Sequence, residues 1–172
     1  VRTSNDDEVH SWSNEAEVII PDSTVSAIIA WGFNGDGQCI VPEPNDGFIA
    51  IGSGYNHCLG VKYDGSTIAW GENNSGQCDV PSPNDSFIQV TGGWHHSIGL
   101  QSDGSVVVWG SDSYGLQDIP VPNSGFTSIA SGLEFIVALK ADGSLRAWGN
   151  NGDGQCDIPS PNNDFIAVAC AD

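Results

Sequence analysis

The sequence is poor in positive charge. It holds four Lys and Arg residues against 22 Asp and Glu residues, for a formal net charge of −18. Binding to a phosphate backbone depends on Lys and Arg side chains that displace counterions, and anionic membrane surfaces attract basic segments for a related reason. The composition therefore argues against nucleic acid and membranes as partners. It favours the approach of a cationic partner.

Long apolar stretches are also missing, and none approaches the roughly 20 residues that a transmembrane helix needs. No apolar period of 3.6 residues is sustained, which argues against a helical solenoid. Methionine is absent, whereas Gly occurs 22 times and Pro nine times. Frequent turn residues between many short apolar runs predict an all-β chain.

A gap-free repeat of 39 residues organises the chain. It is marked by Trp-Gly pairs that begin at Trp31, Trp70, Trp109 and Trp148. The same phase returns in Pro-Asn pairs at Pro44, Pro83, Pro122 and Pro161, and in Phe48, Phe87, Phe126 and Phe165. An identical Asp-Gly-Ser begins at Asp64, Asp103 and Asp142. Self-similarity at such a period indicates a stacked array of one supersecondary unit.

Each unit predicts short antiparallel strands separated by turns. In the first complete unit, strands are expected at 48–52, 57–61 and 67–70, with a tight hairpin at Asp64-Gly65 because Gly accepts a positive φ. The stretch Gly-Gln-Cys-Asp-Val-Pro, residues 76–81, is expected to form a fourth, shorter edge strand, where Pro is tolerated. Four short strands in about 40 residues match one blade of a β-propeller.

The motif Gly-x-x-His-x-x-x-Leu-x-x-Asp-Gly-Ser-x-x-x-Trp-Gly-x-Asn-x-x-Gly-Gln resembles the regulator-of-chromosome-condensation repeat. It is read from Gly93 through Trp109, and most fully from Gly54 to Gln77 with Val61 at the Leu position. The short unit is similar to the bacterial branch of this family, which includes the propeller-type β-lactamase inhibitor protein. The resemblance implies a propeller, commonly a ring of seven blades, of which this chain would supply nearly four.

The predicted organisation has two parts. Residues 1–26 are interpreted as an acidic leader that carries the remnant of a preceding blade. Four repeats follow at 27–65, 66–104, 105–143 and 144–172, the last one incomplete. Residues 165–170 are expected to form the first strand of a further blade. Two interpretations stay open, a fragment of a larger protein or two chains that complete one ring.

The residues that could carry chemistry favour structural roles. His57 and His96 share a repeat position with Phe135, so packing plus a hydrogen bond is expected there rather than catalysis. Neighbouring residues of a strand point to opposite faces, so His57 and Cys58 cannot act as base and nucleophile. The prediction is that the protein is not an enzyme.

The cysteines give no sign of a disulfide framework or a metal site. There are five, an odd number, and Cys39, Cys78 and Cys156 are equivalent positions of separate repeats. Equivalent atoms of neighbouring blades should lie farther apart than a disulfide allows, and no Cys-x-x-Cys pair is present. We expect small thiols, with neither a metal nor a cofactor.

The most informative signal is variation between repeats. Two residues of one turn differ in each unit, whereas the scaffold around them repeats: Tyr55-Asn56, Trp94-His95 and Leu133-Glu134. Equivalent turns of a propeller gather on one face, so these six residues are predicted to bind a partner through exposed aromatic and apolar side chains. A second variable set is a weaker candidate and follows each Trp-Gly pair: Phe33, Glu72, Ser111 and Asn150.

The favoured function is a non-catalytic scaffold that binds a partner protein of unknown identity through this loop face. Two alternatives stay open, a secreted proteinaceous enzyme inhibitor and a guanine-nucleotide exchange factor for a small GTPase. Both are implied by the family resemblance. The compartment is undecided, with a slight leaning to the extracellular space.

Overall fold

The computed structural model describes residues 8–10, 16–19 and 27–171. In these residues the strands form four antiparallel three-stranded sheets, each in chain order. The first sheet holds β1 (Glu8–His10), β2 (Ala16–Ile19) and β3 (Ala27–Ala30). The second holds β4 (Phe48–Ser53), β5 (His57–Lys62) and β6 (Thr67–Gly71). The third holds β7 (Phe87–Gly92), β8 (His96–Gln101) and β9 (Val106–Gly110). The fourth holds β10 (Phe126–Ser131), β11 (Phe135–Lys140) and β12 (Leu145–Gly149).

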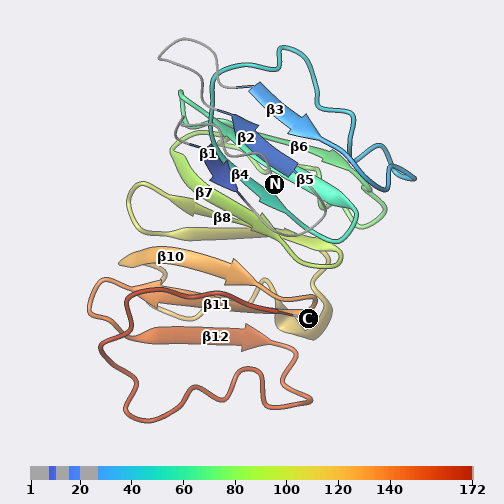
Figure 1. Ribbon diagram of the computed structural model, residues 1–172. Coiled ribbons are helices and arrows are strands. Elements are labelled where there is room, and N and C mark those ends of the chain that lie inside the picture. Colours follow the sequence, from blue (N-terminus) through green and yellow to red (C-terminus); the bar gives the residue numbers. More distant parts are fainter. Residues whose placement is uncertain (1–7, 11–15, 20–26, 172) are drawn as a thin grey trace.

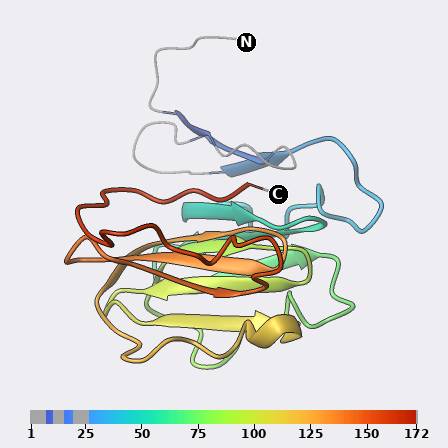
Figure 2. The ribbon, with the colours of Figure 1, turned by 90° about the horizontal axis from the view of Figure 1, so that it is seen from below.

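The sheets follow one another as the blades of a partial β-propeller, as the sequence predicts. Figure 1 shows them stacked in chain order, from the blue sheet of β1–β3 to the orange sheet of β10–β12. In the view turned by 90°, the sheet of β1–β3 lies at one end of the arc (Figure 2). The first strands of neighbouring sheets, β4, β7 and β10, contact one another and form the inner side of the arc.

Alternating residues of each middle strand pack on different neighbours. Leu59 and Val61 of β5 join a cluster with Phe87, Val90 and Trp109 of the following blade. Cys58 faces the other way, into a cluster with Ile28, Phe48 and Trp70. A single three-stranded sheet cannot bury both of its faces, so the next blade supplies the second wall. The predicted two-sided alternation of β5 is confirmed.

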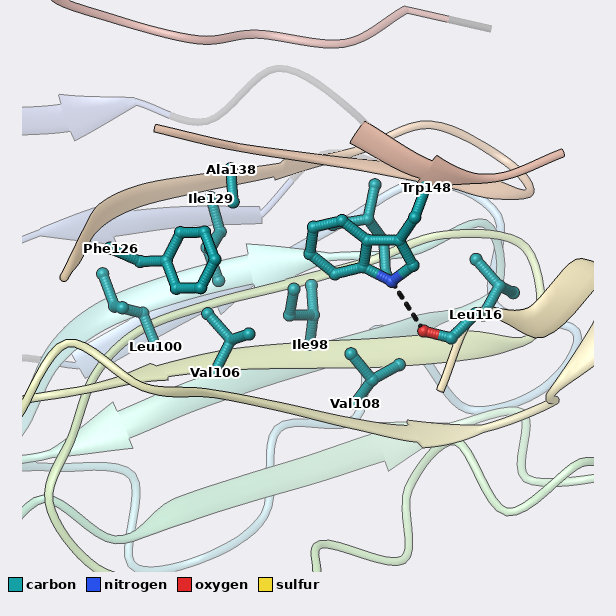
Figure 3. Close-up of a cluster of buried hydrophobic side chains, with 10 residues drawn as sticks. Ile98, Leu100, Val106, Val108, Leu116, Phe126, Ile129, Ala138 and Trp148 are labelled. Atoms are coloured by element: carbon teal, nitrogen blue, oxygen red, sulfur yellow. Dashed lines mark hydrogen bonds between the residues drawn. The ribbon is translucent and has the colours of Figure 1, made fainter. Parts of the chain in front are cut away.

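In the sheets of β4–β6, β7–β9 and β10–β12, the repeated Trp ties the blade to the loop before it. The Trp109 indole Nε1–H donates to the Gln77 carbonyl at 2.9 Å, and the Trp70 indole donates to the Gln38 carbonyl at the same distance. Figure 3 shows the third example, in which the Trp148 indole donates to the Leu116 carbonyl at 2.8 Å within a cluster of buried hydrophobic side chains. The Trp thus buries a large apolar ring and satisfies a buried carbonyl.

The repeated Asn of the Pro-Asn pair acts as a substitute strand partner. The Asn84 side chain accepts from the Thr67 N–H at 2.7 Å and donates to the Thr67 carbonyl at 2.8 Å. The same pair of bonds joins Asn45 to Ile28, Asn123 to Val106 and Asn162 to Leu145. One side-chain amide therefore satisfies both backbone groups at the start of each outer strand.

The predicted hairpin at Asp64-Gly65 is confirmed, and Gly65 has a φ of +80°. The predicted fourth strand at 76–81 is wrong, because this stretch is a loop. Its backbone donors are used inside the loop: the Cys78 N–H bonds the Asn73 side chain at 2.8 Å, and the Asp79 N–H bonds the Gly76 carbonyl at 3.1 Å. They are not available to a strand ladder.

The predicted strand at 165–170 is also not formed. The Phe165 N–H donates to the Gly143 carbonyl at 3.0 Å, just as the Phe126 N–H donates to the Gly104 carbonyl at 2.9 Å. The segment thus begins as the earlier blades do. Residues 165–171 belong to no strand ladder in the described part of the chain.

The region predicted as an acidic leader contains β1 and β2, and β2 pairs with β3 in antiparallel register. The remainder of residues 1–26 lies outside the described residues. In the described part of the chain, no helix has the length and apolar character to cross a membrane.

Candidate interaction face

The six residues predicted to bind a partner lie in three equivalent turns, β4–β5, β7–β8 and β10–β11. Backbone hydrogen bonds join these turns from blade to blade. The Tyr55 N–H donates to the Gly93 carbonyl at 3.0 Å, and the Trp94 N–H donates to the Leu133 carbonyl at 2.8 Å. The three turns therefore lie side by side along one end of the stacked blades.

The aromatic character of this surface is concentrated in the first two turns. Tyr55 is 52% exposed and Trp94 is 41% exposed, with ring centroids 5.9 Å apart and planes tilted by 59°. Trp94 also stacks on the His95 ring, at 5.0 Å and 18°. Leu133 of the third turn is half-buried. The aromatic rings thus form one continuous group that crosses from one blade to the next.

The second variable set continues the same surface. The N–H groups of Glu72, Ser111 and Asn150 donate at 2.8 Å to the carbonyls of Asn56, His95 and Glu134 respectively. We call these nine residues the interaction face: Tyr55, Asn56, Glu72, Trp94, His95, Ser111, Leu133, Glu134 and Asn150.

Sequence reasoning separated the two sets, although the signal that joins them was available. In the β5–β6 hairpin, His57 pairs with Gly71. Asn56, which precedes His57, therefore lies next to Glu72, which follows Gly71. Phe33, the first member of the second set, lies in the loop after β3 and is 74% exposed. It is not among the residues that these bonds bring together.

Carboxylates lie beside the aromatic rings. The Glu72 side chain is only 11% exposed and accepts from the Asn56 amide at 3.4 Å and the Asn74 amide at 3.0 Å. His95 Nδ1 lies 3.8 Å from a Glu72 oxygen, an ion pair only when the imidazole is protonated. The Glu134 carboxylate accepts from the Asn150 amide at 3.1 Å. The face therefore combines exposed aromatic rings with carboxylates held by neutral amides.

A groove of about 580 Å³ runs along the inner side of the arc below these turns. Its walls are the ends of β4, β7 and β10, at 51–55, 89–93 and 129–133, with Cys170 and Ala171 at one side. Much of this lining is backbone and small side chains. The groove offers shape next to the interaction face but few groups for chemistry.

The repeated histidines are structural, as the sequence predicts. Ser97 Oγ donates to the Gln77 carbonyl at 2.8 Å, so it accepts from His57 Nε2–H at 2.9 Å, and the ring is neutral with its proton on Nε2. Burial lowers the pKa of His57 from 6.5 to about 4, and it lowers the pKa of His96 to about 4 as well. Both rings are buried between blades.

The five cysteines are free thiols. Burial raises the pKa of Cys58 to about 12, and it raises the pKa of Cys78 and of Cys170 to about 11. A thiol rather than a thiolate is therefore present at neutral pH, which makes these side chains poor nucleophiles. The described residues include no cluster of three or more His, Cys, Asp or Glu side chains that could hold a metal ion.

Comparison with known proteins agrees with this architecture. The regulator of chromosome condensation (RCC1) repeat family matches three segments, residues 48–77, 87–116 and 126–155. The chain belongs to the RCC1 repeat family. Each matched segment begins at the first strand of one blade and ends in the loop after its third strand. No curated protein sequence matches the chain significantly.

Solved RCC1-type and related structures share the fold. Prp20p from Saccharomyces cerevisiae is 19% identical with a TM-score of 0.72, over 95% of this chain and 50% of Prp20p. Human WBSCR16 is 20% identical with a TM-score of 0.68, over 99% of this chain and 57% of that protein. The receptor kinase CR4 ectodomain from Physcomitrella patens is 20% identical with a TM-score of 0.68, over 91% of this chain and 42% of the ectodomain. The chain thus spans about half the length of these proteins.

Proposed function

We propose that this chain is a non-catalytic binding segment of a propeller, and that it recognises a partner protein through the interaction face. The proposal assigns direct contact to the six turn residues Tyr55, Asn56, Trp94, His95, Leu133 and Glu134. It adds Glu72, Ser111 and Asn150, which the backbone hydrogen bonds place beside them.

The observation that carries the proposal is the Tyr55–Trp94 pair. The two rings come from different blades, lie 5.9 Å apart and are about half exposed. Exposed aromatic side chains at the centre of a surface are typical of binding hot spots, since they offer large contact area at a small cost in side-chain entropy. The buried His and Cys side chains, in contrast, offer no reactive group to a substrate.

The related structures support a protein as the partner. Prp20p has been studied for its binding to Gsp1p and histones, and it has also been solved in complex with Kap60. Those partners belong to Prp20p. What they support for this chain is the class of ligand.

The test is affinity capture from an extract of the source organism, with the full chain as bait. A face variant carries Tyr55→Ser, Trp94→Ser and Leu133→Ser. A matched control variant carries Tyr63→Ser, Ile88→Ser and Val121→Ser, three exposed apolar residues away from the face. We expect one protein to be enriched by the parent and the control and lost from the face variant. Equal capture by both variants, with both still folded, would contradict the assignment of the face.

The two narrower functions are separated by activity assays on the captured protein. Acceleration of nucleotide release from a captured GTPase supports an exchange factor. Loss of activity of a captured enzyme supports an inhibitor. Neither effect is expected of a scaffold that only holds its partner.

A further inference from the structure

We propose that the interaction face takes a basic segment of its partner, with one Arg or Lys side chain that stacks on Trp94 and pairs with the Glu72 carboxylate. This inference rests on the proposed function and specifies the chemistry of the partner. It follows from the distribution of charge, from the setting of Glu72 and from the stacking at Trp94.

The described Lys and Arg side chains all lie away from the face and already have partners. Lys62 Nζ donates to the Pro44 carbonyl at 2.8 Å and lies 3.7 Å from the centre of the Phe48 ring. Lys140 makes the equivalent contacts in the fourth sheet, with the Ser124 carbonyl at 2.7 Å and the Phe126 ring at 4.3 Å.

Arg146, the remaining basic residue of the described chain, donates to the Leu145 carbonyl at 2.8 Å. Both lysines lie at the ends of β5 and β11 that lead into the Asp-Gly-Ser hairpins, opposite the face. The described chain therefore supplies no permanent cation to the interaction face.

Glu72 is a carboxylate without a permanent countercharge among the described residues. Its side chain is only 11% exposed, yet its hydrogen-bond donors are two neutral amides, from Asn56 and Asn74. A carboxylate withdrawn from water is stabilised mainly by a paired charge. Among the described residues, His95 is the cationic group within ion-pair distance of Glu72, and it is positive only on protonation. A Lys or Arg from a partner would supply that charge permanently.

The contacts of His95 show how such a group would fit. The imidazole stacks on Trp94 at 5.0 Å and 18°, and its Nδ1 lies 3.8 Å from the Glu72 carboxylate. A planar guanidinium can likewise stack on an indole while its N–H groups reach a carboxylate. The exposed part of Trp94 and the adjacent Tyr55 ring leave room for this contact on the solvent side.

The overall charge favours the same occupant. A chain with a net charge of −18 attracts a basic segment over long range and repels an acidic one. Nucleic acid is disfavoured on the same ground. An uncharged apolar segment would use the Trp94 and Tyr55 rings but would leave Glu72 without a countercharge. The test must therefore distinguish binding of a basic segment from binding of an uncharged apolar one.

The probe is a fluorescently labelled hexa-arginine peptide, compared with a hexa-citrulline peptide of the same shape but no charge. Binding to the full chain is measured by fluorescence anisotropy at about 0.15 M salt, where long-range attraction is largely screened. The face variants are Glu72→Gln and Trp94→Leu. Their matched controls are Glu43→Gln and Tyr63→Leu, which remove one carboxylate charge and one aromatic ring at exposed positions away from the face.

We expect each face variant to weaken binding of the arginine peptide by about five-fold or more, and each control by less than about two-fold. The citrulline peptide should bind much more weakly to the parent. Equal losses in face and control variants would show general charge attraction and overturn the proposal. Equal binding of the two peptides, or no binding of either, would overturn it as well. Thermal unfolding of each variant checks that the fold is intact.

The two proposals fail in different ways. One outcome is that the triple-serine face variant loses the captured partner while Glu72→Gln changes neither peptide binding nor capture. In that case the proposal of a basic segment is wrong and the proposed function stands. If the triple-serine variant captures the same proteins as the parent, the proposed function is wrong, whatever the peptides show.

Discussion

The two ends of the strands make surfaces with opposite sequence behaviour. At one end the Asp-Gly-Ser hairpins are identical in three blades, and at the other end the turns differ in every blade. At the constant end the repeated side chains form hydrogen bonds within their own hairpins. In each hairpin the Asp accepts from the Ser hydroxyl at 2.6 Å and from the Ser N–H at 2.9 Å.

At the variable end the backbone bonds from Glu72, Ser111 and Asn150 repeat, whereas the side chains of Tyr55, Trp94 and Leu133 have no counterpart of the same type in the next blade. The comparison indicates that a residue type is repeated from blade to blade where its side chain makes contacts within the fold. A position that varies is a candidate for contact with a partner. Variants that alter one class without the other test this rule.

The largest difference is expected between two neighbouring residues, Gly93 at a repeated position and Trp94 at a variable one. Gly93 occupies a repeated position, and a Cβ there would meet His96 Cε1 at 2.1 Å and the Gly132 carbonyl oxygen of the next blade at 2.6 Å. Gly93→Ala should therefore lower the free energy of unfolding by about 3 kcal/mol, as overpacking against backbone does. Trp94→Ala should lower it by only about 1 kcal/mol, through loss of the contacts with Tyr55 and His95. Urea unfolding measures both, and similar values for the two variants would contradict the rule.

Next in size is the loss of the Asn that replaces a strand partner. Asn84→Ala removes two hydrogen bonds to the Thr67 backbone, at 2.7 and 2.8 Å, and leaves those backbone groups without their partner. We expect a destabilisation of about 2 kcal/mol in urea unfolding. Asn84→Asp keeps the acceptor and loses the donor, so its cost should be smaller. A cost for Asn84→Ala as small as that of an interaction-face variant would contradict the assignment.

Buried histidines at a repeated position should make stability fall in mild acid. The pKa of His57 and that of His96 are lowered from 6.5 to about 4 by burial, so below pH 6.5 the unfolded chain binds protons that the folded chain does not. Stability is fully present above pH 6.5 and falls by up to about 1.4 kcal/mol per pH unit for each histidine until the pH reaches about 4.

Thermal unfolding between pH 7 and pH 4.5 measures this slope. His57→Phe copies the residue that the chain itself has at Phe135, so it should fold and should reduce the slope. An unchanged slope in His57→Phe would show that the histidine is not responsible.

The sequence predicted most of the blade because its signals are periodic. The strands, the Asp64-Gly65 hairpin and the structural role of His57 all follow from alternation, turn chemistry and comparison of equivalent positions. The fourth strand failed because the side chains of the loop, such as Asn73, compete for the backbone donors of Cys78. That competition depends on loop geometry, which a strand pattern does not contain.

Contacts between blades were the part that the sequence could not give. His57 pairs with Ser97, but the equivalent of Ser97 in the next blade is Ile136, and His96 pairs instead with Ser131, at 2.8 Å. Ser131 stands where the previous blade has Gly92 and the blade before that has Ser53, so the sequence does not single it out as a partner of His96. The nearness of Glu72 to His95 is a similar case, because it joins two blades that only stacking brings together.

The smallest effect is expected at the constant hairpins, where a change should be measurable as a pKa although the carboxylates are exposed. Hydrogen bonds from the Ser105 hydroxyl and N–H hold the pKa of Asp103 below its usual value of 3.8. A carboxyl with a lowered pKa contributes stability above its ordinary pKa and loses it as the pH falls through the lowered value. Ser105→Ala removes the hydroxyl donor, so the pKa of Asp103 should rise while those of Asp64 and Asp142, held by Ser66 and Ser144, should not change. A carboxyl-detected NMR titration resolves the three hairpins in one experiment. An unchanged pKa of Asp103 would contradict the role of the Ser105 hydroxyl, whereas a rise at Asp103 alone shows that each hairpin is closed by its own serine.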